Sequence, residues 1–312
     1  TALTRAAPRQ LRLRYAGALP LRRPPRLYAL VIGVTEYANL ALRLRFPAKD
    51  ARDMAAVLER QRGGLYQAAE VHTLTDGEAT RARIVKELAW LIERAGEDER
   101  AVLFVAGHGM NDERGRYHFL PHDGDPLDMK KNLSADELQE ALQGLRGRGL
   151  VLLDTCRAGA AMSGQRGDGD TGGLVNRLGL AGVSLGVIAA STGGQAARED
   201  PAWQNGAFTR AALEGLQGRA DYEYKGRISL TLLGNYISQR VPELTHGTQT
   251  PTLVIPSAVE DFQLASVRVR KPLWRTWWFW TAAGVALSAA AAGTAVGVYD
   301  AKTRVPTIDV VQ

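Results

Sequence analysis

The chain has 312 residues but a single cysteine, Cys156, so no disulfide can form within it. This scarcity favours a reducing compartment over a disulfide-stabilised scaffold. Four histidines, His72, His118, His122 and His246, are not spaced as metal ligands usually are. No metal site is therefore expected among them. Neither a GxGxxG nor a GK[ST] motif follows the first apolar run, so a nucleotide-binding α/β domain is a weak alternative.

Acidic residues are absent from positions 1–26, which carry seven arginines and a charge of +7. Residues 267–312 carry a further +4, which leaves −5 for residues 27–266 within the total of +6. The basic character therefore lies in the two ends, and a nucleic-acid-binding face on the middle part is not expected. Residues 1–26 also lack a sustained apolar run, so we interpret them as a flexible basic arm rather than a signal peptide. A solvated tail without a role is the alternative.

One segment, residues 277–298, runs for 22 positions without a charge. As a helix it would be roughly 33 Å long, enough to span a hydrocarbon core. Tryptophans gather at its start, as in an interfacial belt, at Trp274, Trp277, Trp278 and Trp280. We expect a transmembrane helix here, with a buried core helix as the alternative. A basic juxtamembrane linker (267–276) would precede it and a short tail (299–312) would follow.

Charges on either side of this segment predict its orientation. Four cations precede it closely and two follow it, so the positive-inside rule places the large domain in the cytoplasm of a single-pass membrane protein. Gly293 and Gly297 form a GxxxG pair, which indicates helix-mediated self-association.

Between the two ends, residues 27–266 alternate apolar runs with helical periodicity. The runs, typical of strands, are 27–34, 70–74, 101–106, 150–153 and 186–190. Helical spacing occurs over 51–58, 84–95, 138–145, 208–216 and 230–241. Thr80 and the pair Ser134 and Glu137 supply N-cap signals. This alternation predicts an α/β domain whose mostly parallel sheet is covered by helices on both faces. Active residues would then lie beyond the carboxyl ends of the strands.

Two polar motifs follow two of these strands. His108 lies in Gly107-His108-Gly109 and Cys156 in D-T-C-R-A-G, starting at Asp154. A free thiol has a pKa near 8.5, and a nearby imidazole can take its proton and return it to a leaving amine. The N–H groups of Gly109 and Cys156 are candidate donors to an oxyanion. A small buried cysteine and a structural histidine are the alternatives.

Together these motifs resemble the caspase–metacaspase family of cysteine peptidases. The spacing of 48 positions from His108 to Cys156 is typical of caspases. Further matching pieces are Gly33-Val34 with Tyr37, Lys49-Asp50-Ala51, Tyr117–Pro121 with Asp123, Ala190-Ser191 with Gln195 and Glu199, and Gly206–Thr209. The resemblance covers about residues 27–265. It implies a six-stranded caspase-like sheet, Cys156 as nucleophile and His108 as general base.

The resemblance also implies a substrate preference. Metacaspases carry an aspartate two positions before the nucleophile and another at the start of the first helix, which match Asp154 and Asp50 here. Such a pair would bind a substrate Arg or Lys at P1, the position before the cleaved bond. The alternative is that Asp50 caps a helix and Asp154 is a structural acceptor. No cofactor is expected, because Asp168 and Asp170 are too few for a clear calcium site.

The segment 157–177 is rich in glycine and lies where family members carry a linker that is cut on activation. Arg166 and Arg177 are its candidate autocleavage sites. Similar bacterial proteins act in stress or defence, and a non-catalytic scaffold that tethers partners at the membrane is the alternative. The motif reads Cys156-Arg157-Ala158-Gly159, nearer to animal caspases than to the metacaspase C-H-S-G.

Overall fold

The structure is a computed structural model that describes residues 23–157, 174–175, 177–178, 184–190, 199–200, 204–257, 259–269 and 277–282. Its centre is a sheet with the strand order β11-β7-β6-β3-β1-β2. These strands are β1 (Arg26–Gly33), β2 (Ala68–Thr75), β3 (Arg100–Asn111), β6 (Arg148–Arg157), β7 (Leu185–Ala189) and β11 (Thr252–Val254). All neighbours along this path are parallel except β11, which runs antiparallel to β7.

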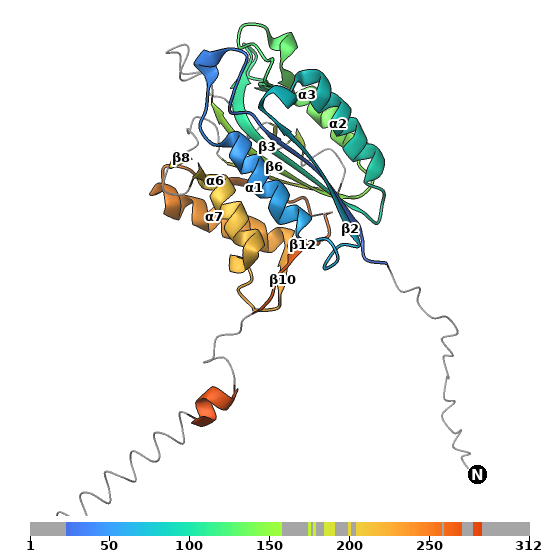
Figure 1. The fold of residues 1–312 in the computed structure, drawn as a ribbon, viewed down its shortest axis with the longest axis vertical. Helices are drawn as coiled ribbons and strands as arrows, with labels where there is room; N and C mark the ends of the chain where they lie inside the picture. Colours follow the sequence, from blue (N-terminus) through green and yellow to red (C-terminus); the bar gives the residue numbers. More distant parts are fainter. Residues whose placement is uncertain are drawn as a thin grey trace, which may run out of the picture.

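Among the described residues, helices cover the sheet in two layers, one on each face (Figure 1). One face carries α1 (Pro47–Glu59), α6 (Ala207–Glu214) and α7 (Leu230–Thr245), and the other carries α2 (Arg81–Arg94) and α3 (Ala135–Gln143). Alternate residues of each strand enter separate cores: Phe104 packs toward α1, α6 and α7, whereas Leu103 packs toward α2 and α3. The prediction of a mostly parallel sheet with helices on both faces is confirmed.

Local signals explain where the helices begin. The Thr80 side chain accepts a hydrogen bond from the Arg83 N–H at the start of α2. Ser134 and Glu137 form a complete capping box at α3, as their spacing predicts. Helix α1 begins earlier than its apolar periodicity predicts, because Pro47 supplies the first helical position.

Short elements complete the fold. A β3–β4 hairpin extends the sheet through β4 (Tyr117–Phe119) and β5 (Leu133–Ser134), and two small ladders join β8 (Glu199–Asp200) to β9 (Asn205–Gly206) and β10 (Arg227–Ser229) to β12 (Gln263–Ser266). The remaining turns are η1 (Leu40–Leu42), η2 (Asp76–Glu78), η3 (Met129–Lys131) and η4 (Gly215–Arg219). None of these elements is predicted from apolar periodicity, because each is too short to show it.

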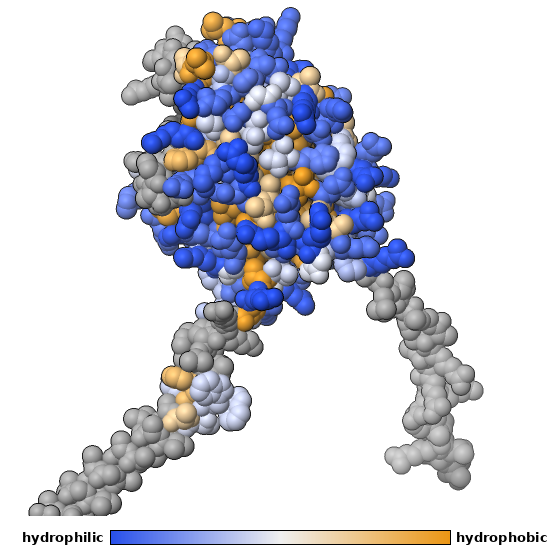
Figure 2. All heavy atoms as spheres, in the orientation of Figure 1, coloured by the Kyte–Doolittle hydropathy of each residue, from blue (hydrophilic) through white to orange (hydrophobic). Residues whose placement is uncertain are grey.

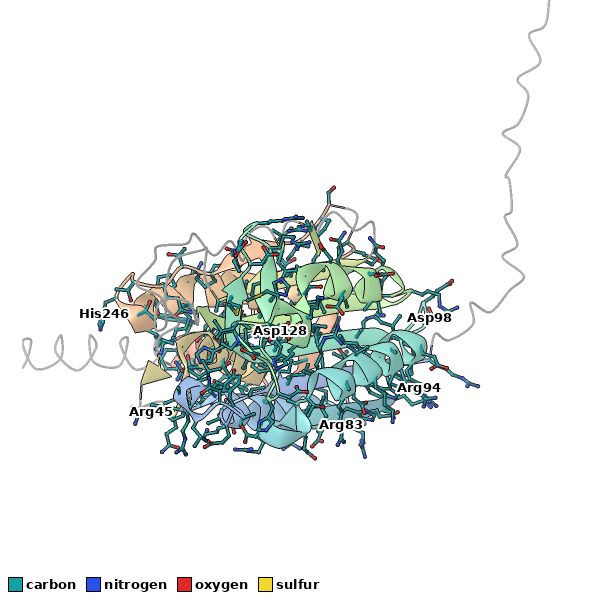
Figure 3. The ribbon with its side chains drawn as sticks, turned by 90° about the horizontal axis from the view of Figure 1, so that it is seen from above. Arg45, Arg83, Arg94, Asp98, Asp128 and His246 are labelled. Carbon is teal, nitrogen blue, oxygen red and sulfur yellow. The ribbon has the colours of Figure 1, made fainter. Side chains whose placement is uncertain are left out.

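One face of the molecule is largely polar. Hydrophilic residues cover most of the face shown in Figure 2, with apolar residues scattered among them. Seen from above, Arg83, Arg94 and Asp98 lie at the periphery and point outward (Figure 3).

Within the segment expected to span a membrane, residues 277–282 form a short helix with exposed Trp277, Trp278 and Trp280. Residues 283–298, including Gly293 and Gly297, lie outside the described part of the chain. No helix among the described residues is long and apolar enough to cross a membrane.

Candidate functional site

The two motif residues lie on neighbouring strands. Strands β3 and β6 pair in parallel from Arg100 opposite Arg148 to Gly109 opposite Arg157, and this register places His108 directly opposite Cys156. Adjacent strands lie about 4.7–4.9 Å apart, so the backbone brings the two positions within reach of one proton transfer. Both residues are in the last few positions of their strands, at the carboxyl edge of the sheet.

The contacts of the His108 imidazole define its tautomer. Its Nε2 lies 2.9 Å from the carbonyl oxygen of Leu42. A carbonyl can only accept, so Nε2 carries the hydrogen and the neutral ring keeps its lone pair on Nδ1. That Nδ1 is buried and has no hydrogen-bond partner among the described side chains. The arrangement leaves the basic nitrogen free to receive a proton.

Burial also sets the charge state of this ring. His108 is 8% exposed, and burial lowers its pKa below 6.5, while the hydrogen bond to Leu42 acts in the opposite direction. The imidazole is therefore neutral at pH 7, which is the form that a general base requires.

Tyr37 holds the backbone at this position. Its hydroxyl oxygen accepts a hydrogen bond of 2.8 Å from the His108 N–H, and its ring lies 5.2 Å from the imidazole between centroids. Gly107 adopts a φ of +148°, and a Cβ there would lie 2.9 Å from the Tyr37 hydroxyl oxygen. Only glycine satisfies both conditions, so the sequence Gly107-His108 is a requirement of this packing.

A second tyrosine links the two strands. The Tyr117 ring packs against Gly109, and its hydroxyl donates to Thr155 Oγ1 at 3.0 Å. Tyr117 thus connects the residue after His108 with the residue before Cys156. The resemblance marked Tyr117 and Tyr37 only as parts of family motifs, and the structure gives each a contact within the site.

The two acids expected to bind substrate are both buried, with Asp50 2% and Asp154 5% exposed. They come from different elements, α1 and β6, and both lie close to Gly206. A Cβ on Gly206 would be 2.9 Å from Asp154 Oδ2 and 3.4 Å from Asp50 Oδ2. The structure therefore brings the two carboxylates together at the N-terminus of α6.

Each carboxylate has protein donors. Asp50 Oδ1 accepts from Asn205 Nδ2 at 2.7 Å, and its Oδ2 accepts from the Gly206 N–H at 3.2 Å. Asp154 Oδ2 accepts from the N–H and the hydroxyl of Thr209, at 3.2 and 2.5 Å. Asp154 thereby satisfies a first-turn N–H of α6, whose N-cap Gly206 has no side chain to do so.

The alternative to a substrate pocket is that Asp50 caps a helix and Asp154 is a structural acceptor. Asp50 lies inside the first turn of α1, whose N-cap is Phe46, and its carboxylate accepts hydrogen bonds from Asn205 and Gly206. Asp154 does act as a structural acceptor.

Of the remaining candidate residues, the structure describes Arg177. Arg177 forms an ion pair of 2.8 Å with Asp136, and Arg166, Asp168 and Asp170 lie outside the described residues. No group of three or more His, Cys, Asp or Glu side chains that could hold a metal ion occurs in the described part.

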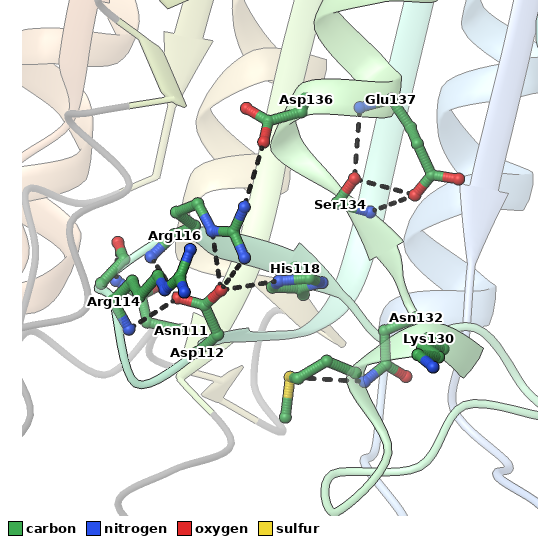
Figure 4. A network of polar contacts seen from close by, with 12 residues as sticks. Asn111, Asp112, Arg114, Arg116, His118, Lys130, Asn132, Ser134, Asp136 and Glu137 are labelled. Atoms are coloured by element: carbon green, nitrogen blue, oxygen red, sulfur yellow. Dashed lines mark hydrogen bonds and ion pairs between the residues drawn. The ribbon is translucent and has the colours of Figure 1, made fainter.

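Three of the remaining histidines have local contacts of their own. His72 stacks on Trp90 with Nδ1 2.7 Å from Glu87. The buried His118 lies in a polar network with Nε2 3.6 Å from Asp112 (Figure 4). His122 Nδ1 lies 2.6 Å from the carbonyl oxygen of Glu36.

Sequence reasoning missed three contributors to the site. Leu42 acts through its carbonyl, which no side-chain motif can reveal. Asn205 meets Asp50 across 155 positions of sequence and Thr209 meets Asp154 across 55, although Asn205 adjoins the motif Gly206–Thr209 and Thr209 belongs to it. That motif was the available signal.

Comparison with known proteins agrees with this geometry. A family model described as a caspase domain matches residues 26–263. The crystal structure of protein GSU0716 from Geobacter sulfurreducens is similar, with a TM-score of 0.53 and 23% identity over 78% of this chain and 94% of that chain. A search of curated proteins gave no match. Because the family model covers most of its length, the chain belongs to the caspase-domain family of cysteine peptidases.

Proposed function

We propose that the protein is a cysteine endopeptidase that cleaves its protein substrates after Arg or Lys. The observation that carries the proposal is His108, a neutral imidazole with a free Nδ1, placed opposite Cys156 on the neighbouring strand. Membership of the caspase-domain family supports the peptidase class, and the Asp50–Asp154 pair supports the basic preference.

The reaction follows from these positions. His108 Nδ1 takes the proton of the Cys156 thiol, and the thiolate attacks the carbonyl carbon of the scissile bond. The N–H groups of Gly109 and Cys156 are the proposed donors to the resulting oxyanion. The imidazolium then protonates the leaving amine, and water hydrolyses the thioester with His108 again as base. The Leu42 carbonyl keeps the ring oriented throughout by holding Nε2–H.

Asp50 and Asp154 would bind the P1 side chain. Both carboxylates are buried and close to Gly206, and a guanidinium can donate to two carboxylate groups. Lysine would reach them with a single ammonium group, so Arg is expected to be the better substrate.

A panel of fluorogenic peptides that end in Arg, Lys or Asp tests the proposal, with and without calcium. Wild type should cleave after Arg and Lys, and Cys156→Ala and His108→Gln should be inactive. Asp154→Asn should lose basic substrates, whereas Asp98→Asn at the exposed periphery is a matched control and should not. Cleavage only after Asp would contradict the pocket assignment. No cleavage by wild type would favour the non-catalytic scaffold.

Two further proposals concern self-cleavage and membrane anchoring. Self-cleavage after Arg166 would give a new end at Gly167 in wild type but not in Cys156→Ala, as seen by mass spectrometry. Anchoring by residues 277–298 would make the full chain float with liposomes, whereas a chain ending at residue 269 would not. A cytoplasmic orientation and a role in stress or defence are part of the same proposal.

A further inference from the structure

A cavity of about 340 Å³ opens beside the β3–β4 hairpin. This volume lies within the range of small-molecule sites, about 300–1,000 Å³. The start of α2, the strand β4, the turn η3 and the start of α3 all contribute to its wall. Its ionisable residues are Arg81, Arg116, His118, Lys130, Asp136 and Glu137. Neither the dyad nor the acid pair lines this cavity, so it is a different site from the one described above.

His118 is the buried polar side chain of the wall. It is 6% exposed, and neither ring nitrogen has a hydrogen-bond partner within the described part of the chain. Its Nε2 lies 3.6 Å from Asp112 Oδ2, which is too far for a hydrogen bond. Figure 4 shows the ring between the Asp112–Arg116 pair and the segment that carries Asn132. A buried polar group without a partner costs free energy, so this ring points to a ligand with complementary polar atoms.

The pairing of β4 explains why the imidazole faces the cavity. His118 is opposite Met110 of β3 and opposite Ser134 of β5. Its neighbours Tyr117 and Phe119 are buried in the core beneath α2 and α3. Successive side chains of a strand point to opposite faces, so His118 is turned away from that core. The strand therefore presents one polar side chain to the cavity.

Both acids in the wall already contact arginines. Glu137 forms an ion pair with Arg81, and Asp136 lies 3.6 Å from Arg116. Arg116 also pairs with Asp112 at 2.8 Å. The negative charges around the cavity are therefore offset within the protein, and a cationic ligand would have to compete with two arginines for them.

Donors remain for an anion. The contacts of Arg81 use Nε and Nη2, and Nη1 has no described partner. Lys130 is exposed and has no carboxylate partner among the described residues. In a protonated imidazole both nitrogens donate, so His118 could direct Nε2–H toward Asp112 and still offer Nδ1–H to a ligand. Three side chains thus have donors for one anionic group, and a phosphate has three strong acceptor oxygens.

We propose that this cavity binds the phosphate group of a small molecule through Arg81, Lys130 and His118, and that His118 takes up a proton on binding. The proposal goes beyond the proposed function and does not depend on it, because binding is measured without cleavage. It assigns a ligand site to a part of the fold that the dyad and the acid pair leave unused.

Titration calorimetry of the full chain with inorganic sulfate tests the proton uptake, because sulfate keeps its charge between pH 8 and pH 6. Carboxylates ordinarily titrate near pH 4, and lysine and arginine above pH 10, so the imidazole is the group that changes charge in this range. Affinity should rise about tenfold from pH 8 to pH 6, and heats measured in two buffers of different ionisation enthalpy should show proton uptake at pH 8. Binding that does not change with pH would overturn the role of His118.

His118→Gln removes the group that titrates. The variant should bind sulfate weakly at both pH values, and its thermal melt shows whether it folds. Binding as tight and as pH-dependent as in wild type would contradict the proposal.

Lys130→Gln keeps the experiment decisive if His118→Gln does not fold, since it changes an exposed side chain. Loss of one charged donor should weaken sulfate binding about tenfold. Lys225→Gln is the matched control, because Lys225 is an exposed lysine in the turn before β10, and it should bind as wild type does. The basic ends of the chain are common to all variants, so they cannot cause a difference between them. Equal binding by Lys130→Gln and Lys225→Gln would place the anion elsewhere and overturn the site.

Inorganic phosphate and ribose 5-phosphate distinguish the sources of the anionic group. Tighter binding of ribose 5-phosphate would identify an organic phosphate as the ligand class, and tighter binding of inorganic phosphate would identify the free ion. Either result should be weakened by Lys130→Gln. No binding of sulfate or of either phosphate by wild type at pH 6 would refute the proposal.

Discussion

Replacing Tyr37 by Phe tests how the backbone at the general base is held. The change removes one oxygen and keeps the ring that lies against the imidazole. The His108 N–H, now 2.8 Å from that oxygen, would lose its acceptor in a residue that is 8% exposed. An unsatisfied buried donor costs about 1–3 kcal/mol, so the free energy of unfolding should fall by that amount.

Catalysis should respond in a definite way. Gly107 and His108 form the segment that Tyr37 fixes, so the loss of the hydrogen bond lets Nδ1 move relative to Cys156. A misplaced base lowers kcat, and we expect a fall of about tenfold with KM for an Arg peptide unchanged. Urea denaturation and steady-state turnover of the same preparations measure the two effects.

Tyr222→Phe is the matched control. Tyr222 is 47% exposed and its hydroxyl lies 3.5 Å from Gln239, so its removal should change stability by less than about 0.5 kcal/mol. If Tyr37→Phe were as stable as Tyr222→Phe, the buried hydrogen bond would not support the strand as argued. If stability fell but kcat did not, Tyr37 would support the fold alone.

Three further changes probe other parts of the structure. Burial lowers the pKa of His108 below its unfolded value, so below about pH 6.5 the unfolded chain binds a proton that the fold rejects, and stability is lost. His108→Gln should reduce that loss between pH 7.5 and 5.5 in urea denaturation, and an equal loss in both proteins would contradict the assignment. Gly107→Ala should cost about 1–3 kcal/mol, because its φ is +148° and its Cβ would meet the Tyr37 hydroxyl; an unchanged thermal melt would argue against this strain. Burial and the Glu214 hydrogen bond raise the pKa of Tyr236 to about 12, so Glu214→Gln should lower this pKa toward 10. An unchanged pKa in an ultraviolet titration of the tyrosine would mean that burial alone causes the shift.

The central sheet was predictable because its strands are buried on both faces. Such strands are uninterrupted apolar runs, and β1, β3, β6 and β7 each overlap one of the runs that the sequence shows, within a residue or so at the ends of β1 and β7. Helix starts were predictable where a side chain performs the capping, as Thr80 does. The neighbouring arrangement of β3 and β6 followed from the caspase resemblance rather than from periodicity.

The finer parts of the site were not predictable from local pattern. The partner of His108 Nε2 is a main-chain carbonyl at Leu42, and every residue type has such a group. The hydrogen bond from Asn205 to Asp50 joins residues 155 positions apart, and it arises only when the segment before α6 packs against α1. The short strands β8 and β9 carry too few residues to show an alternation.

Different segments of the chain support the general base, His108, and the buried acid Asp154. His108 is held by Tyr37 and Leu42, both between β1 and α1, whereas Asp154 is held by Thr209 at the start of α6. Sites without shared partners act additively. The segment after β1 can therefore tune the chemical step, while the turn before α6 can alter which P1 side chain is bound. The same dyad could serve a different substrate class through changes around Gly206 alone.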